Sequence, residues 1–388
     1  MIKSAAQVDS FIYNSHYLHS RFASDVYLVL KPPAELSQSQ ADTYALAYDL
    51  YVHAARELHV MGYRIFCERV FATPSAMARV LNARRDALGQ LSDEVEPTCI
   101  IIEAGELGEF AGVQIHAVKA PMPPMVIRKP DDNVTPVGRQ INIRGDKWLM
   151  LNGLFADEAD SPADQTLTVF NHATQLLKQS GGTFDSVART WLWLKEICNW
   201  YDDLNRVRNN RFIEHGLIAP QTKQSCRLPA STGIGLYGIN GAAITMDIIA
   251  LPGREDQIQY IEAGGDQHSA YEYGSAFSRA AIAPMPGGNT VFISGTAAID
   301  HHGITENIGQ IPAQVDKTIT HVQSLLHDLN SDDQQVCFAL VYCKTVEVQQ
   351  YFLQQYKNLP WPMITMIGDV CRPDLLFEVE VTAGQKDK

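Results

Sequence analysis

The apolar positions along the chain follow two alternating periods. Short runs rich in β-branched and aromatic residues predict strands, for example at 25–30, 63–72 and 186–195. Between them, apolar residues recur three or four positions apart and predict helices, for example at 40–58 and 163–179. Strands and helices therefore alternate, which favours an α/β (α+β) fold in which helices cover one face of a sheet.

The same order of elements occurs three times. Each pass reads β-α-β-α-β and ends on an apolar strand whose last residue is Ala120, Ala250 or Ala383. The two intervals between these alanines are nearly equal, and an interval of that length indicates repeated domains, not a short solenoid repeat. A proline-rich segment after Ala120 and a long polar segment after Ala250 read as connectors. The predicted domains are 1–122, 137–252 and 260–388.

Composition narrows the class of protein. With 388 residues, 46 % hydrophobic and 19 % charged, the chain is expected to be globular, with two or three cores. The net charge of −13 and the lack of a basic stripe argue against a nucleic-acid partner. No apolar run approaches the roughly 20 residues of a membrane span, and the N-terminal stretch lacks the apolar centre of a signal peptide. A cytoplasmic protein without a membrane partner is therefore expected.

No cofactor or metal site is indicated. The seven cysteines include no C-x-x-C pair, so they are expected to be reduced thiols. His301 and His302 stand beside Asp300, but no third ligand follows at a metal-binding interval, and a solvated turn is favoured. The segment GIGLYG (233–238) matches a dinucleotide motif, yet a strand-like run follows it where a helix is required. Its glycines are expected to let a loop pass close to a ligand or a neighbouring domain.

The last predicted strand, in CRPDLLFEVEV (371–381), carries two acids within an apolar run. The two-residue period places Glu378 and Glu380 on one face, and Phe377 and Val379 on the other. The glutamate face must therefore meet solvent, a cationic partner or a ligand. From the pattern alone, Glu380 is expected to be a solvated or helix-facing partner, and Glu378 either a structural ion-pair residue or a catalytic acid.

Several motifs in the second and third repeats resemble those of a known family. The element order is similar to that of the RidA (YjgF) family, whose small domains form trimers with ligand clefts between neighbours. Within that group, the sequence resembles the chorismatases, which look like RidA domains fused into an intramolecular pseudo-trimer. The first repeat matches only as a pattern. The motifs that carry the resemblance are RTWLWL (189–194), LPASTGIG (228–235), YGSAFSRA (273–280), SGTAAID (294–300) and CRPDLLFEVE (371–380).

The resemblance implies one active site per chain. When the terminal strands are aligned on their last alanine, Glu378 stands opposite Ile115 in the first repeat and Thr245 in the second. Only the third repeat then offers an acid. The arginine that RidA imine deaminases carry falls on Met363, so imine hydrolysis is disfavoured. One chain that supplies all three units is expected to be a monomer or weak dimer.

The resemblance also implies roles for particular residues. Glu378 is expected to be the catalytic acid, with Cys371 beside it, although a lone cysteine could equally be an inert buried thiol. Arginines could instead form surface salt bridges, but a dicarboxylate substrate needs planar cations that bind in a bidentate manner. The expected substrate-binding residues are Arg208, Arg279, Tyr273, Tyr201, Arg372 and Lys344.

The implied activity is cleavage of the enolpyruvyl ether of chorismate. The products would be pyruvate and an aromatic or dihydroxycyclohexadiene acid, and a cysteine at position 371 resembles the branch that forms 3-hydroxybenzoate for secondary metabolism. Chorismatases tend to carry an arginine where this chain has Lys344, which leaves the exact substrate open. Two other readings remain: a non-catalytic binder of aromatic or keto acids, and a lyase or hydrolase acting on a related carboxylate.

Overall fold

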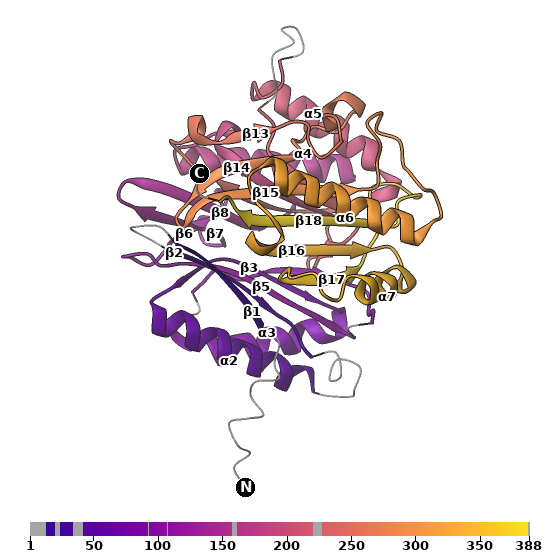
Figure 1. Cartoon of the computed structure of the whole chain (residues 1–388). Coiled ribbons are helices and arrows are strands. Elements are labelled where there is room, and N and C mark those ends of the chain that lie inside the picture. The colour runs from indigo at the N-terminus through magenta and orange to yellow at the C-terminus, as the bar shows by residue number, and fades with distance from the viewer. Residues whose placement is uncertain are drawn as a thin grey trace.

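The computed structural model describes residues 13–19, 24–33, 42–91, 93–106, 108–156, 161–219 and 227–386. The expectations about the N-terminal stretch (1–12) and the predicted helix start at Gln40 lie outside these residues. The described chain is a mixed α/β structure with three six-stranded sheets, arranged as three similar units of one pseudo-trimer (Figure 1).

The first unit forms a sheet in the order β1-β2-β5-β3-β4-β11. Its helix α2 begins after Asp42, whose side chain accepts a hydrogen bond from the amide of Tyr44, and ends at Gly62 with φ of 72°. That left-handed geometry favours glycine. The bounds are β1 Tyr13–His19, β2 Ser24–Leu30, α2 Thr43–Met61, β3 Arg64–Ala72, α3 Pro74–Leu88, β4 Thr98–Ile101 and β5 Phe110–Val118.

The second unit forms a sheet in the order β10-β9-β12-β8-β7-β6. Helix α4 begins after Ser161, whose hydroxyl accepts a hydrogen bond from the amide of Asp164, and has a proline in its first turn. The bounds are β6 Met125–Arg128, β7 Pro136–Ile143, β8 Asp146–Leu154, α4 Pro162–Gln179, β9 Val187–Leu194, α5 Tyr201–Glu214, β10 Ala230–Ile234, β11 Tyr237–Gly238 and β12 Ile244–Ala250.

The third unit forms a sheet in the order β13-β14-β15-β18-β16-β17. Strand β18 lies at its centre, antiparallel to both β15 and β16. The bounds are β13 Gln259–Ile261, β14 Ala280–Met285, β15 Gly288–Ala297, α6 Ile311–Asp328, β16 Val336–Cys343, α7 Val346–Gln355, β17 Met363–Ile367 and β18 Phe377–Gly384.

The predicted central strands and helices are present within a few residues of their expected bounds, but the edge strands were missed. The proline-rich connector (121–136) contains β6 and the start of β7, and the polar connector (251–289) contains β13 and β14. Reading both as simple linkers was wrong. β6 and β13 are short, half-exposed edge strands that lack the apolar alternation of central ones, and the largely buried β7 and β14 pair beside them. The domain bounds 1–122, 137–252 and 260–388 stay predictions.

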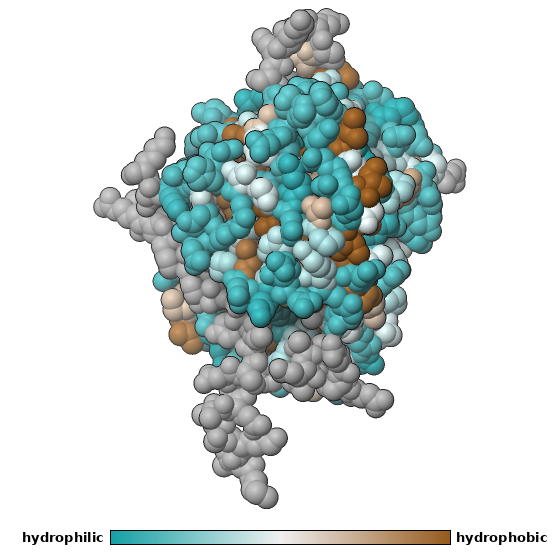
Figure 2. All heavy atoms as spheres, turned by 45° about the vertical axis from the view of Figure 1, so that its right-hand side comes forward, coloured by the Kyte–Doolittle hydropathy of each residue, from teal (hydrophilic) through white to brown (hydrophobic). Residues whose placement is uncertain are grey.

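Four apolar clusters explain how the units hold together. In each unit, one cluster packs the sheet against its own helices. A further cluster joins all three units and includes Phe71 of β3, Trp193 of β9 and Leu340 of β16. Each sheet therefore buries one face under helices and the other against its neighbours. Figure 2 shows a surface on which hydrophilic residues dominate and hydrophobic ones form scattered spots. None of the helices described is long and apolar enough to cross a bilayer.

Candidate active site

A cavity lies where the second unit meets the third. Its walls come from α5 and β10 of the second unit and from β15, β18 and the segments preceding β14 and β18 of the third. Its volume is only about 30 Å³, so side chains must move to admit an organic ligand. We call it the Glu378 cavity. Seven of the eight predicted site residues line it: Tyr201, Arg208, Tyr273, Arg279, Cys371, Arg372 and Glu378.

Glu378 enters this cavity from the middle of a sheet. It pairs with Ala297 of β15 on one side and Tyr342 of β16 on the other, and only 5 % of its surface is exposed. Its carboxyl lies directly over Gly295, where any side chain would collide with it. Glycine at this position makes room for the acid.

The surroundings of Glu378 favour its protonated form. Burial, reinforced by the negative charge of Glu380, raises the pKa of Glu378 from 4.5 to about 8, while Arg189 and Arg279 pull it down. Desolvation therefore outweighs the two cations, and the carboxyl is neutral at pH 7. A buried acid that keeps its proton at neutral pH can act as a general acid.

Glu380 differs from its expected role. It is 5 % exposed and accepts hydrogen bonds from Arg189 Nη2 at 2.8 Å and from Trp191 Nε1 at 2.6 Å. The expectation of a solvated or helix-facing side chain was wrong, because this face of the third sheet packs against the second sheet, whose strand β9 carries both partners. Of the two acids on one strand face, one has a cationic partner and the other faces the cavity.

Helix α5 contributes Tyr201 and Arg208. Arg208 is 2 % exposed; its Nη2 donates to Asn205 Oδ1 at 2.6 Å, while its Nε has no partner among the residues described. Burial lowers the pKa of Arg208 and raises that of Tyr201. The Tyr201 hydroxyl lies 3.4 Å from Ser275 Oγ. A buried guanidinium with an unused donor is suited to an anionic ligand.

The third unit contributes two more arginines, which flank Tyr273. Arg279 Nη2 donates to the Tyr273 hydroxyl at 2.7 Å, and Arg372 Nη1 donates to the Gly303 carbonyl at 2.6 Å. Their guanidinium carbons lie 5.5 and 5.6 Å from the Tyr273 ring centroid. Within the described residues, Arg208, Arg279 and Arg372 form no ion pair with a carboxylate. Three cations without a carboxylate partner therefore line one cavity.

Cys371 reaches the same cavity because the chain turns before β18. The Leu375 amide donates to the Arg372 carbonyl at 3.3 Å, which forms a turn. Burial, with a contribution from Glu378, raises the pKa of the Cys371 thiol to about 12. The sulfur is therefore a neutral thiol at pH 7, not a nucleophilic thiolate.

Lys344 is the one predicted site residue that the structure places elsewhere. It lines a separate cavity of about 450 Å³ near the ends of β4, β10 and β17, which we call the Lys344 cavity. Its Nζ donates to the Pro373 carbonyl at 2.8 Å and lies 3.6 Å from Asp369 Oδ1. Lys344 thus supports the segment that carries Cys371 and does not line the Glu378 cavity.

The equivalent positions of the other units carry no acid. The strand pairs β3–β5, β9–β12 and β16–β18 each contain a β-bulge. When the three units are aligned on these bulges, Glu378 corresponds to Thr245 of β12 and to Gly112 of β5. The expected equivalence with Ile115 was wrong, because β5 ends at Val118 and not at Ala120. Ile364 of β17 lies against Gly112, so apolar packing fills the corresponding place in the first unit.

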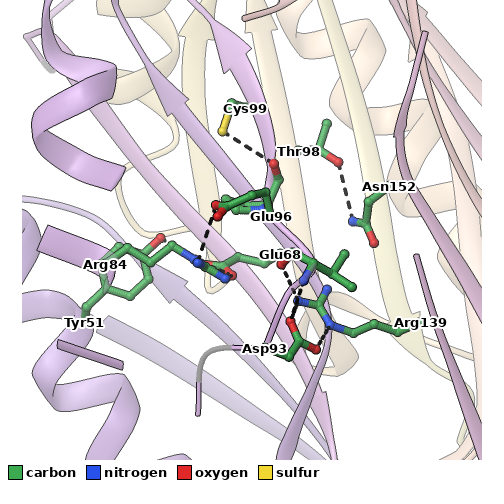
Figure 3. Close-up of polar contacts among 11 residues, drawn as sticks. Tyr51, Glu68, Arg84, Asp93, Glu96, Thr98, Cys99, Arg139 and Asn152 are labelled. Atoms are coloured by element: carbon green, nitrogen blue, oxygen red, sulfur yellow. Dashed lines mark hydrogen bonds and ion pairs between the residues drawn. The ribbon is translucent and has the colours of Figure 1, made fainter. Parts of the chain in front are cut away.

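The first unit does bury a glutamate, and its environment shows what a structural acid looks like here. Glu68 of β3 accepts hydrogen bonds from Arg84 Nε and Nη2 at 2.8–2.9 Å and from the Tyr51 hydroxyl at 2.8 Å (Figure 3). Beside it in the same view, Arg139 pairs with Asp93. Glu68 is saturated by protein donors, whereas no hydrogen bond to Glu378 is found from the described residues.

Several lining residues were not singled out from the sequence. Ser275 and Phe277 lie in the quoted YGSAFSRA motif, Ser231 and Gly233 in LPASTGIG, and Gly295 in SGTAAID. The motifs therefore marked segments that line the Glu378 cavity. Small and uncharged residues gave no chemical signal of their own. Met363 begins β17 and packs in the apolar cluster of the third unit.

Comparisons with known proteins support the fold. No model of a protein family matches the sequence, and no curated protein matches it. A solved chorismatase is similar over 96 % of this chain and 99 % of its own, with a TM-score of 0.62 and 18 % identity. A YjgF-family member from Neisseria meningitidis covers 34 % of this chain and 97 % of its own, with a TM-score of 0.26 and 17 % identity. The chain therefore has the fold of the chorismatase, which confirms the predicted fold class.

Proposed function

We propose that this protein cleaves the enolpyruvyl ether of chorismate and releases pyruvate. The observation that carries the proposal is a buried carboxyl whose pKa is about 8, placed in a cavity with three arginines for which the described part of the chain offers no carboxylate partner. The first feature supplies a proton and the second binds a dicarboxylate. The fold shared with a chorismatase supports the same substrate.

In the proposed reaction, the arginines hold the two carboxylates of the substrate and so fix the ether between them. Arg208 comes from the second unit, and Arg279 and Arg372 come from the third, so the substrate lies across the boundary between units. Orientation of this kind lowers the entropic part of the barrier. Because the cavity has a volume of only about 30 Å³, Arg372 and Tyr273, which line it, are expected to move when the ligand enters.

Glu378 then gives its proton to the vinyl methylene carbon. The π electrons of the vinyl group form the new C–H bond, and an oxocarbenium-like centre develops at the ether carbon. The bond between the ring carbon and the ether oxygen then breaks, its electron pair goes to the oxygen, and pyruvate departs from a ring cation. Migration of the neighbouring hydroxyl oxygen to that carbon and loss of a ring proton to the Glu378 carboxylate give 3-hydroxybenzoate, whereas addition of water gives the dihydroxycyclohexadiene acid. Release with an aromatic hydroxybenzoate requires no net water, whereas release with a dihydroxycyclohexadiene acid consumes one water molecule.

The neutral thiol of Cys371 favours 3-hydroxybenzoate as the second product. A small, polarisable and weakly hydrogen-bonding group beside the reacting ring holds fewer water molecules than a hydroxyl would. With water kept away, aromatisation competes better with hydrolysis. We therefore propose 3-hydroxybenzoate formation as the specific activity.

The direct test is incubation of the purified protein with chorismate, isochorismate and prephenate, followed by measurement of pyruvate. We expect release from chorismate, with 3-hydroxybenzoate identified by chromatography and mass. Decay of all three compounds at the rate seen without protein would overturn the proposal and favour a non-catalytic binder. Pyruvate release from isochorismate or prephenate alone would favour a lyase or hydrolase acting on a related carboxylate.

A further inference from the structure

A buried polar network lies next to Glu378 and takes no direct part in the proposed chemistry. Glu380, two residues along β18, is bound by Arg189 and by the indole N–H of Trp191. Arg189 Nη2 also donates to Thr232 Oγ1 at 2.5 Å, and the Gly295 amide donates to the same oxygen at 3.0 Å. The network thus connects Glu380 to the backbone against which the Glu378 carboxyl lies.

The first unit braces this network from the other side. Arg69 of β3 stacks on the Trp191 ring at 3.7 Å and donates to Asp247 Oδ2 at 2.7 Å. Asp247 also accepts hydrogen bonds from Thr98 and from the Gly153 amide. Arg69 and Asp247 are at most 2 % exposed. The Trp191 ring is therefore in contact with two guanidinium groups, one from each of the first two units.

The unequal surroundings of the two glutamates determine which one is charged. Two carboxylates on one face of a buried strand repel each other, so ionisation of one opposes ionisation of the other. Glu380 accepts from a cation and an N–H, whereas no hydrogen bond to Glu378 is found in the described structure. The proton therefore stays on Glu378, the acid of the two without a cationic partner.

We propose that Glu380 is a positioning residue: paired with Arg189 and bound by Trp191, it lies on the same strand face as Glu378 and keeps Glu378 in the protonated form that donates to the substrate. Its role in catalysis rests on the proposed function, but the coupling between the two carboxyls does not. The other charged or titratable groups that act on Glu378 or respond to it are Arg189, Arg279, Cys371, Tyr201 and Tyr342.

The coupling can be measured without any substrate. Carbon-13 NMR of labelled glutamate carboxyls follows the titration of the whole protein, and the spectrum of Glu378→Gln assigns the resonance of Glu378 by difference. The informative variants are Glu380→Gln, which leaves Arg189 without its counter-charge, and the double variant Glu380→Gln/Arg189→Gln. The control is Glu347→Gln, which removes one exposed acid near the start of α7.

The pKa of Glu378 is expected to be highest in the wild type, lower in the double variant and lowest in Glu380→Gln. The single variant should lie lower than wild type by about one unit or more, because a repelling anion is lost while an attracting cation remains. The double variant loses both charges and should fall between, and it reports the coupling even if the single variant does not fold. Glu347→Gln should titrate like wild type.

A Glu378 titration in both variants within about 0.3 units of wild type would overturn the proposal. If chorismate is a substrate, the pH at which kcat falls should move down in the same order. Absence of turnover in wild type would overturn the proposed function alone, because the NMR titration would still report the coupling.

Discussion

At the scale of single residues, Glu378 is a buried acid that accepts no hydrogen bond from the residues that the structure describes. Burying a carboxyl without a donor costs free energy, and folded chains rarely retain such a group unless it is used. Glu68 shows that this fold can pair a buried glutamate fully. Glu378 is instead buried, protonated and directed into a cavity lined by arginines, as expected of a proton donor.

Glu378→Gln tests this role directly. The amide has nearly the same shape and no acidic proton, so folding and chorismate binding should persist while pyruvate release falls at least ~100-fold. Binding is measured by calorimetry and turnover by pyruvate assay, with Glu347→Gln as a matched control expected to keep normal turnover. A variant that retains more than about a tenth of wild-type turnover would show that Glu378 is not the acid.

The same residue should make both activity and stability depend on pH. The pKa of Glu378 is about 8 in the folded protein and 4.5 in its unperturbed form. At pH values between these two, the folded state therefore holds a proton that the unfolded state has lost. Stability must then fall as pH rises through this window, and activity must be lost above about pH 8. Glu378→Gln should be more stable than wild type by roughly 1–3 kcal/mol at pH 8 and close to it at pH 4. Thermal melts at both pH values measure this, and equal differences at the two would contradict it.

At the scale of elements, strongly periodic segments were predictable and edges were not. Helix α4 ends where the pattern placed it and begins one residue earlier, and the bounds of β3 and β9 shift by only a residue. β6 and β13 are short and half exposed, and they are held by pairing with strands the local sequence does not reveal. Glu378 was found because an acid interrupts an apolar strand. The partners of Glu380 were not, because Arg189 lies far away in sequence on another sheet.

The position of Cys371 is set by the turn before β18. Cys371→Ala should keep pyruvate release within roughly tenfold, about 1.4 kcal/mol in barrier, because the acid is untouched. The product should shift from 3-hydroxybenzoate toward a non-aromatic diol or 4-hydroxybenzoate, because water can enter the space left by the sulfur. Chromatography against authentic standards measures the distribution. An unchanged product distribution would show that Cys371 is only a packing residue. The control is Cys371→Ser, whose side chain has a similar size but a more strongly hydrated group.

At the scale of the molecule, one chain supplies the three units that single-domain proteins would obtain by assembly. The shared apolar cluster closes the three sheets on one another. We therefore predict a monomer or weak dimer. Sedimentation velocity over a range of concentrations should show one species near the 43.1 kDa of the chain, and a stable homotrimer would contradict it.

The first unit carries Gly112 and no acid at the position that corresponds to Glu378, and we predict that it acts as a brace. Arg69→Met removes the partner of Asp247 and leaves a charge buried at the junction of the units, which should cost about 3–5 kcal/mol of unfolding free energy. The double variant Arg69→Met/Asp247→Asn removes both charges and should recover most of that loss, because an apolar side chain can fill the same space. Urea unfolding measures both. If the single variant is as stable as wild type, or if the double variant is no more stable than the single one, then the Arg69–Asp247 pair does not hold the units together.

Arg69→Met should also loosen the packing of Trp191. The turnover of Arg69→Met, measured well below its unfolding midpoint, should therefore fall more than the turnover of Arg84→Met, which breaks a buried pair far from the site.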